Sequence, residues 1–135
     1  MAYLLSLLLL LSPVGPPRAA AAFEKLKALE GDWMSYSSKG WSGDMSLRVI
    51  ASGSAVVATS RFEEAHPGET MLSVFHLDGD RLLLTHYCVA RNQPRLEATE
   101  ISPDLSTITF TFRDATNLAS RDAESRHSFG PACRQ

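Results

Sequence analysis

The chain changes its periodicity at Gly31, and this change constrains the fold more than any other feature. Before it, Phe23, Leu26 and Leu29 follow one another at helical spacing. After it, apolar and polar residues alternate with the period of two that is typical of half-buried β-strands. Gly31-Asp32-Trp33 stands at the junction. The glycine permits a tight turn, and we expect the indole of Trp33 to plug the closed end of a β-barrel.

The alternating region predicts about seven short strands between Asp32 and Phe112, with no long helix among them. Its clearest hairpin joins Glu69–Leu77 to Arg81–Cys88 through Asp78-Gly79. Successive hairpins at this spacing indicate an all-β fold, an antiparallel up-and-down meander closed into a barrel or a sandwich, and we expect the barrel. One short N-terminal helix, Phe23–Glu30, would pack on the open end of that barrel, because two turns of helix are marginal alone.

The C-terminal end lacks the alternation. Arg113–Leu118 is interpreted as a turn or loop, and residues 118–135 as an irregular tail. Arg126–Phe129 could begin a strand, but Gly130-Pro131 would stop it. A barrel needs a last strand to pair with the first, since exposed strand edges promote aggregation. The sequence therefore leaves open whether the barrel closes.

The N-terminus has the pattern of a secretory signal peptide over residues 1–22. Tyr3–Leu11 is an apolar core, proline residues then interrupt it, and Ala19–Ala22 offers a small-residue cleavage site before Phe23. The apolar run is too short to span a bilayer as a helix. We therefore expect export to the periplasm or the medium, with no stable membrane span after cleavage and a barrel domain over residues 23–117.

Charge and cysteine content exclude some classes of protein. The chain has 135 residues and a formal net charge of −2, which favours one domain. It has no basic stripe, which argues against nucleic acid as a partner. Two cysteines, Cys88 and Cys133, could pair in an oxidising compartment, but one disulfide cannot be assigned from sequence.

Three blocks of sequence together resemble a group of bacterial lipocalin-like, or calycin-like, proteins. They are Gly31-Asp32-Trp33, the stretch from His76 through Cys88 to Arg95, and Asp114-Ala115-Thr116-Asn117. The resemblance implies a lipocalin-like β-barrel over about residues 23–117 and carries no biochemical function with it. In that group further strands usually follow the last block, so the resemblance also implies a truncated or frame-shifted end here.

One histidine is the candidate polar anchor of a binding site. His86 shares a strand face with Leu82, Leu84 and Cys88, and this face is otherwise apolar. A buried histidine satisfied by one hydrogen bond would explain it, and so would a polar group that orients a ligand inside a cavity. We expect a small apolar ligand to contact His86, and the predicted walls of its site are Leu82, Leu84, Ile108, Phe110 and Phe112.

A metal site shared by His76 and His86 is not expected. A hairpin turn at Asp78-Gly79 would place His86 opposite residue 71 or 70, about 20 Å along the strands from His76. One metal ion cannot bridge that separation. The chain also lacks a nucleophile elbow, a phosphate-binding glycine loop and a Cys-x-x-Cys pair. No metal, cofactor or catalytic residue is therefore predicted.

Two alternatives to ligand binding remain open. The first is a barrel enzyme that uses His86 as general acid or base, assisted by Tyr87 or Glu97. The second is a truncated product with little function. Arg95, Glu97 and Thr99 share one strand face, which base rates of burial assign to the outside of the barrel.

Overall fold

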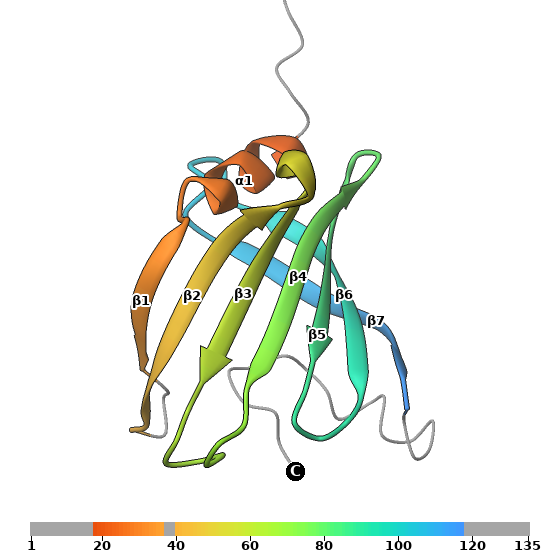
Figure 1. Ribbon diagram of the computed structural model, residues 1–135. Helices are drawn as coiled ribbons and strands as arrows, with labels where there is room; N and C mark the ends of the chain where they lie inside the picture. The colour runs from red at the N-terminus through yellow and green to blue at the C-terminus, as the bar shows by residue number, and fades with distance from the viewer. Residues whose placement is uncertain (1–17, 37–39, 118–135) are drawn as a thin grey trace, which may run out of the picture.

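One antiparallel sheet, covered at one end by a helix, accounts for the described part of the chain (Figure 1). The computed structural model describes residues 18–36 and 40–117. The elements are α1 (Arg18–Lys27), β1 (Gly31–Tyr36), β2 (Ser42–Ile50), the short 3₁₀ turn η1 (Ala51–Gly53), β3 (Ala55–Arg61), β4 (Met71–Asp78), β5 (Arg81–Tyr87), β6 (Gln93–Ile101) and β7 (Ile108–Thr116). Each strand pairs with its neighbours in sequence, so the sheet order is β1 to β7. The predicted all-β up-and-down meander is confirmed.

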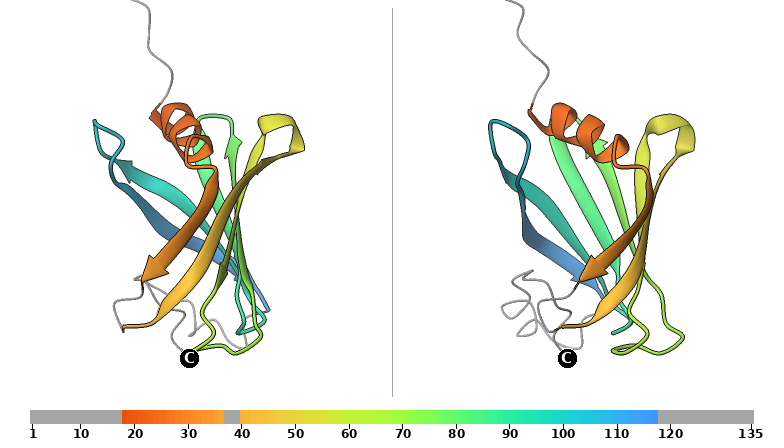
Figure 2. Two further views of the ribbon diagram at one scale, coloured as in Figure 1. Left: turned by 60° about the vertical axis from the view of Figure 1, so that its left-hand side comes forward. Right: turned by 90° about the vertical axis from the view of Figure 1, so that its left-hand side faces the viewer.

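The sheet curls but does not close over the described residues. No pairing joins β1 to β7 there, and Figure 2 shows these two strands as the opposite edges of the curled sheet. The architecture is thus an incomplete barrel within residues 18–36 and 40–117. The predicted tail at residues 118–135, with Cys133, lies outside the described residues, so the pairing of Cys133 with Cys88 stays untested.

Helix α1 fills the end of the sheet where the β2–β3, β4–β5 and β6–β7 turns lie (Figure 2). Ala22 is fully buried and Phe23 is 3% exposed, both packed against the strand side chains of a core cluster. At the start of the helix, Arg18 Nη1 donates a hydrogen bond of 3.3 Å to the Ile101 carbonyl oxygen. At its other end, Lys27 Nζ donates one of 3.4 Å to Gly53 O. The helix is therefore held at both ends.

The helix begins five residues earlier than the periodicity predicts. It starts at Arg18 rather than Phe23 and ends at Lys27. The signal-peptide cleavage site predicted between residues 22 and 23 falls inside this helix, where Ala19 and Ala22 are buried. Alanine is both the strongest helix former and a typical residue of signal-peptide cleavage sites. The alanine run is therefore compatible with the first turns of α1 and with a cleavage site. The predicted signal core lies outside the described residues, and no described helix is long and apolar enough to cross a membrane.

Trp33 does not plug the barrel, contrary to expectation. Its side chain is on the inner face of β1 but remains 46% exposed. Its Nε1 donates a hydrogen bond of 2.9 Å to Leu29 O, which ties β1 to the turn that follows α1. The physical reason is that β1 is an edge strand among the strands that the structure describes, so a side chain there has described sheet on one side only. The buried aromatic side chain at the helix-covered end is instead Phe23 of α1, which is 3% exposed.

Strand β7 continues through residues predicted to be a turn. Arg113, Asp114 and Ala115 belong to it, opposite the beginning of β6. The register shifts at Arg95/Leu96 and again at Ala98/Glu100. Each bulge inserts one residue and reverses the alternation of faces beyond it. The period of two is therefore lost in the sequence although the ladder continues.

Candidate functional site

The two faces of the curled sheet differ completely in charge. Alternation along each strand places the buried residues Leu47, Val56, Leu82 and Leu96 on the inner face. No inward-facing residue of the described strands is Asp, Glu, Lys or Arg. The polar side chains that face inward are the serines of β1, β3 and β4 and one histidine of β5: Ser35, Ser60, Ser73 and His86. Any chemistry on the inner face therefore begins from uncharged groups.

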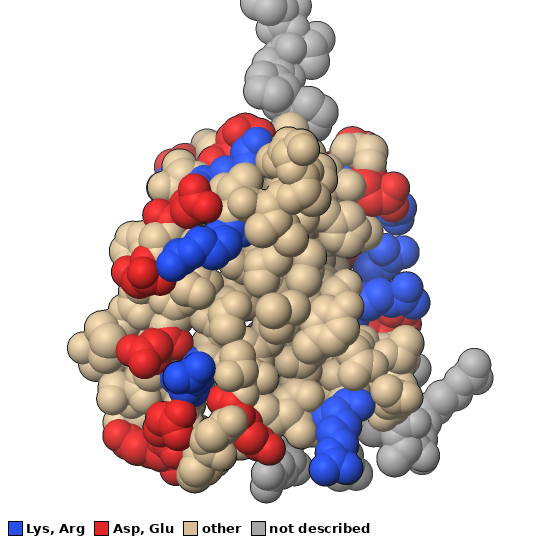
Figure 3. Space-filling model, viewed as in Figure 1, with Lys and Arg blue, Asp and Glu red and all other residues tan. Residues whose placement is uncertain are grey.

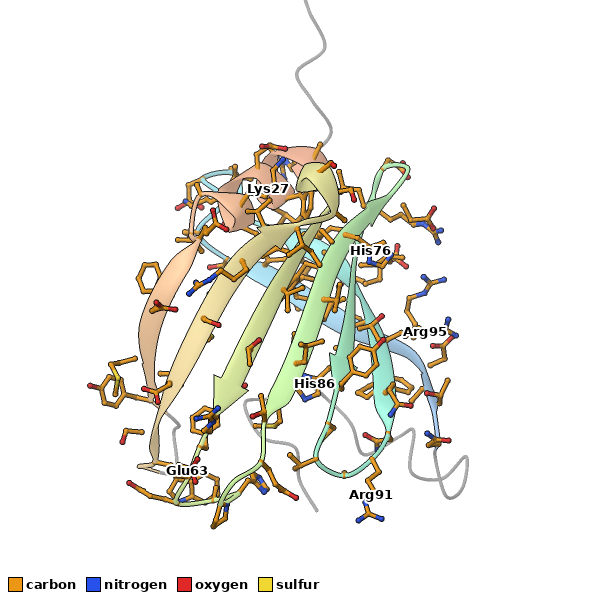
Figure 4. The ribbon with its side chains drawn as sticks, in the orientation of Figure 1. Lys27, Glu63, His76, His86, Arg91 and Arg95 are labelled. Carbon is orange, nitrogen blue, oxygen red and sulfur yellow. The ribbon has the colours of Figure 1, made fainter. Side chains whose placement is uncertain are left out.

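His86 and Ser73 form a polar pair on this face. They lie directly opposite each other on β5 and β4, and Ser73 Oγ is 2.8 Å from His86 Nδ1. The two atoms share a hydrogen bond whose donor depends on the imidazole tautomer. His86 is 7% exposed. Figure 4 shows it toward the end of the sheet away from the helix, whereas Lys27 lies at the helix-covered end.

Burial keeps the imidazole neutral. Desolvation of the charged form lowers the pKa of His86 from its ordinary value of 6.5. No carboxylate faces it from the inner side of the described strands. The pair therefore presents a neutral imidazole and a hydroxyl at neutral pH.

The predicted apolar walls divide between two regions of the inner face. Leu82 is fully buried in the core cluster with α1, and Phe110 packs edge-to-face on Phe75 at 5.8 Å between ring centroids. Both belong to the helix-covered half. Leu84, which is 4% exposed, lies beside His86, and Phe112 is half-buried in the same cross-sheet row. Only Leu84 and Phe112 thus accompany His86.

Sequence reasoning missed the residues that complete this region. They are Ser73, Ser60, Met71 and Leu96, which face inward from β4, β3 and β6. The error came from the hairpin. Its loop is Gly79-Asp80, with Asp78 opposite Arg81, and Gly79 adopts a φ of +62°. The expected two-residue loop was Asp78-Gly79. Choosing Gly79-Asp80 instead would have given the observed register, with His86 opposite Ser73.

The same register corrects the geometry of the two histidines. His76 lies opposite Leu83, so His86 is three residues farther along β5, about 10 Å at strand spacing. The distance expected from the sequence was about twice as long. His76 and His86 also face opposite sides of the sheet. No group of three or more potential ligands among His, Cys, Asp and Glu occurs in the described residues.

Acid–base assistance from the predicted partners does not fit this geometry. Tyr87 is 48% exposed, and both Tyr87 and Glu97 lie on the outer face, away from His86. Ser73 could be activated by His86 as a nucleophile, but acyl transfer also needs donors for an oxyanion. Ser73 is paired on both sides, with Ala58 of β3 and His86 of β5, so its backbone is engaged in the ladders. The arrangement favours binding over acyl transfer.

The outer face carries the charges, as predicted for Arg95 and Glu97. Arg95 donates two hydrogen bonds to Asp114, of 2.5 and 2.6 Å, and Arg113 Nε lies 3.4 Å from Glu97 Oε2. Arg95, Arg113 and Asp114 border a hollow of about 290 Å³ beside His76. Figure 3 shows charges at both flanks of this face, with an uncharged band between them. Each arginine bordering the hollow is paired with a carboxylate, which weakens its attraction for an anion.

Comparison with known proteins yields no assignment. No family model, no curated protein and no solved structure matches the chain. Function must therefore be argued from the site.

Proposed function

We propose that this protein binds a small, mainly apolar molecule on the inner face of a lipocalin-like half-barrel. The observation that carries the proposal is the His86–Ser73 pair, 2.8 Å apart on a face otherwise formed by apolar and small residues. An apolar site with one or two fixed polar groups is the usual composition of a small-molecule site. We further propose that the protein acts in the periplasm or outside the cell, because its first residues have the pattern of a signal peptide.

Accessible apolar surface supports this proposal. Phe112 faces inward yet is only half-buried, and Trp33, on the same face, is 46% exposed. At the helix-covered end the inner face is packed by Ala22 and Phe23. A ligand on the inner face would cover the accessible part of such side chains, at a gain of about 25 cal/mol per Å².

Titration with Nile red, a neutral apolar dye, tests the proposal. The wild-type protein should bind the dye with saturable fluorescence. Phe112→Asp should weaken binding at least about tenfold, because a ligand covering this position would desolvate a carboxylate. Thr111→Asp, one residue away on the outer face, is the matched control and should bind normally.

Circular dichroism should show that both variants remain folded, and Phe112→Ser replaces Phe112→Asp if the latter unfolds. Equal dye binding by the inner-face and outer-face variants would place the dye elsewhere and refute the proposed site.

A further inference from the structure

We propose that the hollow on the outer face, between β4 and β7, binds a phosphate monoester. This inference does not depend on ligand binding at the inner face, because it concerns the opposite side of the sheet. The juxtaposition that carries it is a set of hydrogen-bond donors around one hollow of about 290 Å³: Arg95, Arg113, His76 and Thr85. Such a volume lies at the lower end of the range for small-molecule sites, which favours a ligand of few atoms.

The register of the sheet brings these side chains together. Thr85, Arg95 and Asp114 lie opposite one another on β5, β6 and β7 and form one cross-strand row on the outer face. His76 belongs to the next row, where it lies opposite Leu83. Figure 4 shows His76 and Arg95 at the same flank of the sheet. Neighbouring rows on one face are separated by about 7 Å, so a group of a few atoms can contact both.

A β-bulge adds Arg113 to this hollow. The register shifts after the Arg95–Asp114 pair, which leaves Arg113 as an extra residue of β7. Strict alternation would direct residues 113 and 114 to opposite faces. Instead, Asp114 contacts Arg95 and Arg113 lies near Glu97, both on the outer face. Bulges often redirect a side chain beside a functional site, and here the bulge places a second guanidinium next to the first.

The two guanidiniums have N–H groups in excess of their acceptors. Arg95 donates to Asp114 through Nε and Nη2. Arg113 Nε is 3.4 Å from Glu97 Oε2, which is longer than the about 2.9 Å of a strong charge-assisted hydrogen bond. Neither guanidinium makes another hydrogen bond within the described residues. The terminal oxygens of a phosphate accept several hydrogen bonds and match the planar fork of arginine.

His76 and Thr85 complete the lining of the hollow with further donors. The His76 side chain is half-buried, and neither it nor the Thr85 hydroxyl is hydrogen-bonded to another described residue. An imidazole N–H and a hydroxyl can each donate to a ligand oxygen. A phosphate between the two rows would therefore accept hydrogen bonds from both of them.

The charges around the hollow favour an anion over a cation. Two arginines and one aspartate line it, and this aspartate, Asp114, is already engaged by Arg95. Positive charge is thus in excess at the surface of the hollow. Glu97, beside Arg113, opposes this excess and weakens the attraction for an anion. The balance between Arg113 and Glu97 should therefore control the affinity.

Calorimetric titration of the full chain with glycerol 3-phosphate tests the proposal, with glycerol as the uncharged match. In a buffer free of phosphate and sulfate we expect saturable binding of the monoester and none of glycerol. Arg113→Gln should weaken binding at least about fivefold, because it removes a fork of donors and a charge. Arg61→Gln is the matched control, since Arg61 is also on the outer face and lies 3.8 Å from Glu63. It should leave the affinity unchanged.

A second pair of variants releases an arginine instead of removing one. Glu97→Gln removes the carboxylate beside Arg113 and should raise the affinity for glycerol 3-phosphate at least about threefold. Glu63→Gln, beside Arg61, is its control and should have no effect. Equal effects within either pair would overturn the proposal, as would saturable binding of glycerol. Circular dichroism should show that the variants are folded, and the Glu97→Gln pair decides if Arg113→Gln unfolds.

The same phosphate monoester occurs in soluble molecules and in the headgroup of phosphatidic acid. Co-sedimentation with phosphatidylcholine vesicles that contain phosphatidic acid distinguishes these sources from each other. Binding of either probe that Arg113→Gln weakens and Arg61→Gln does not supports the site and identifies its source of phosphate. Binding of neither glycerol 3-phosphate nor these vesicles overturns the proposal and leaves the inner-face function, tested with Nile red, unaffected.

Discussion

The helix-covered half of the inner face and the half around His86 are built from the same strands but differ in packing and polarity. In the first half, α1 contributes Ala22 and Phe23 to a cluster with Val56 and Leu82, none of them more than 3% exposed. In the second half, the half-buried Ser60 and Ser73 lie with His86 among buried apolar side chains that include Leu84 and Leu96. One face thus combines an apolar core under the helix with a region that also carries polar side chains.

The difference follows from what covers each half. A strand face becomes a core only where a second layer packs on it. Helix α1 is that layer, and its two terminal hydrogen bonds, from Arg18 and Lys27, hold it over one end of the sheet. Stability should therefore depend mainly on the helix-covered half, and ligand recognition on the other.

The largest expected effect is loss of the first half of α1. A chain that begins at Phe23 lacks Arg18, Ala19 and Ala22, and the remaining helix is too short to form without its packing. We expect it to be less stable than a chain that begins at Arg18 by about 3–5 kcal/mol. Urea unfolding of the two chains measures this. Equal midpoints would show that the fold begins at Phe23, as the cleavage pattern predicts.

The next largest effect on stability is expected from truncating single large side chains, and it should differ between a buried position and an exposed one. Leu82→Ala removes a fully buried side chain under α1 and should cost about 2–5 kcal/mol. Trp33→Ala removes a larger side chain that is 46% exposed, so it should cost clearly less. Denaturant titrations of both variants check the order. A greater loss of unfolding free energy for Trp33→Ala would show that the indole packs in the core after all.

A third prediction concerns close packing at the end of the sheet away from α1. A Cβ on Gly43 would collide with the Arg61 carbonyl oxygen and the Phe62 ring. We expect Gly43→Ala to destabilise the protein by about 1–3 kcal/mol through overpacking. Ser42→Ala, at the adjacent residue, is the control and should change the thermal midpoint little. A neutral Gly43→Ala would indicate that this end rearranges easily.

The smallest expected effect is the pH dependence contributed by His86. Because its pKa is lowered in the folded state, the unfolded chain binds the proton first as pH falls below 6.5. The free energy of unfolding should therefore decrease as pH falls from about 6.5 to the lowered pKa and then level off. His86→Gln should remove this component in urea titrations between pH 7 and 5.

His76→Gln, on the outer face, is the matched control for that series and should retain the slope. A slope that survives His86→Gln would assign the pH dependence to another group.

The sequence determined most of the architecture. Alternation identified the core faces of β5 and β7, and the break at Gly31 separated helix from sheet. The apolar neighbours of His86 on its own strand face followed from the same alternation. These features depend on residues close in sequence, where the period of two fixes the face of each side chain. The outward placement of Arg95 and Glu97 followed from base rates of burial rather than from alternation.

Only the tertiary structure decided which side chains meet across the sheet. The hairpin register placed Ser73, not residue 70 or 71, opposite His86, and a shift of one loop position was enough to hide the pair. Likewise, Trp33 is exposed because β1 is an edge, and Ala22 is buried because α1 crosses the end of the sheet. Sequence patterns specify the face of a strand, but burial depends on the layer packed against that face, which is contributed by residues distant in the chain.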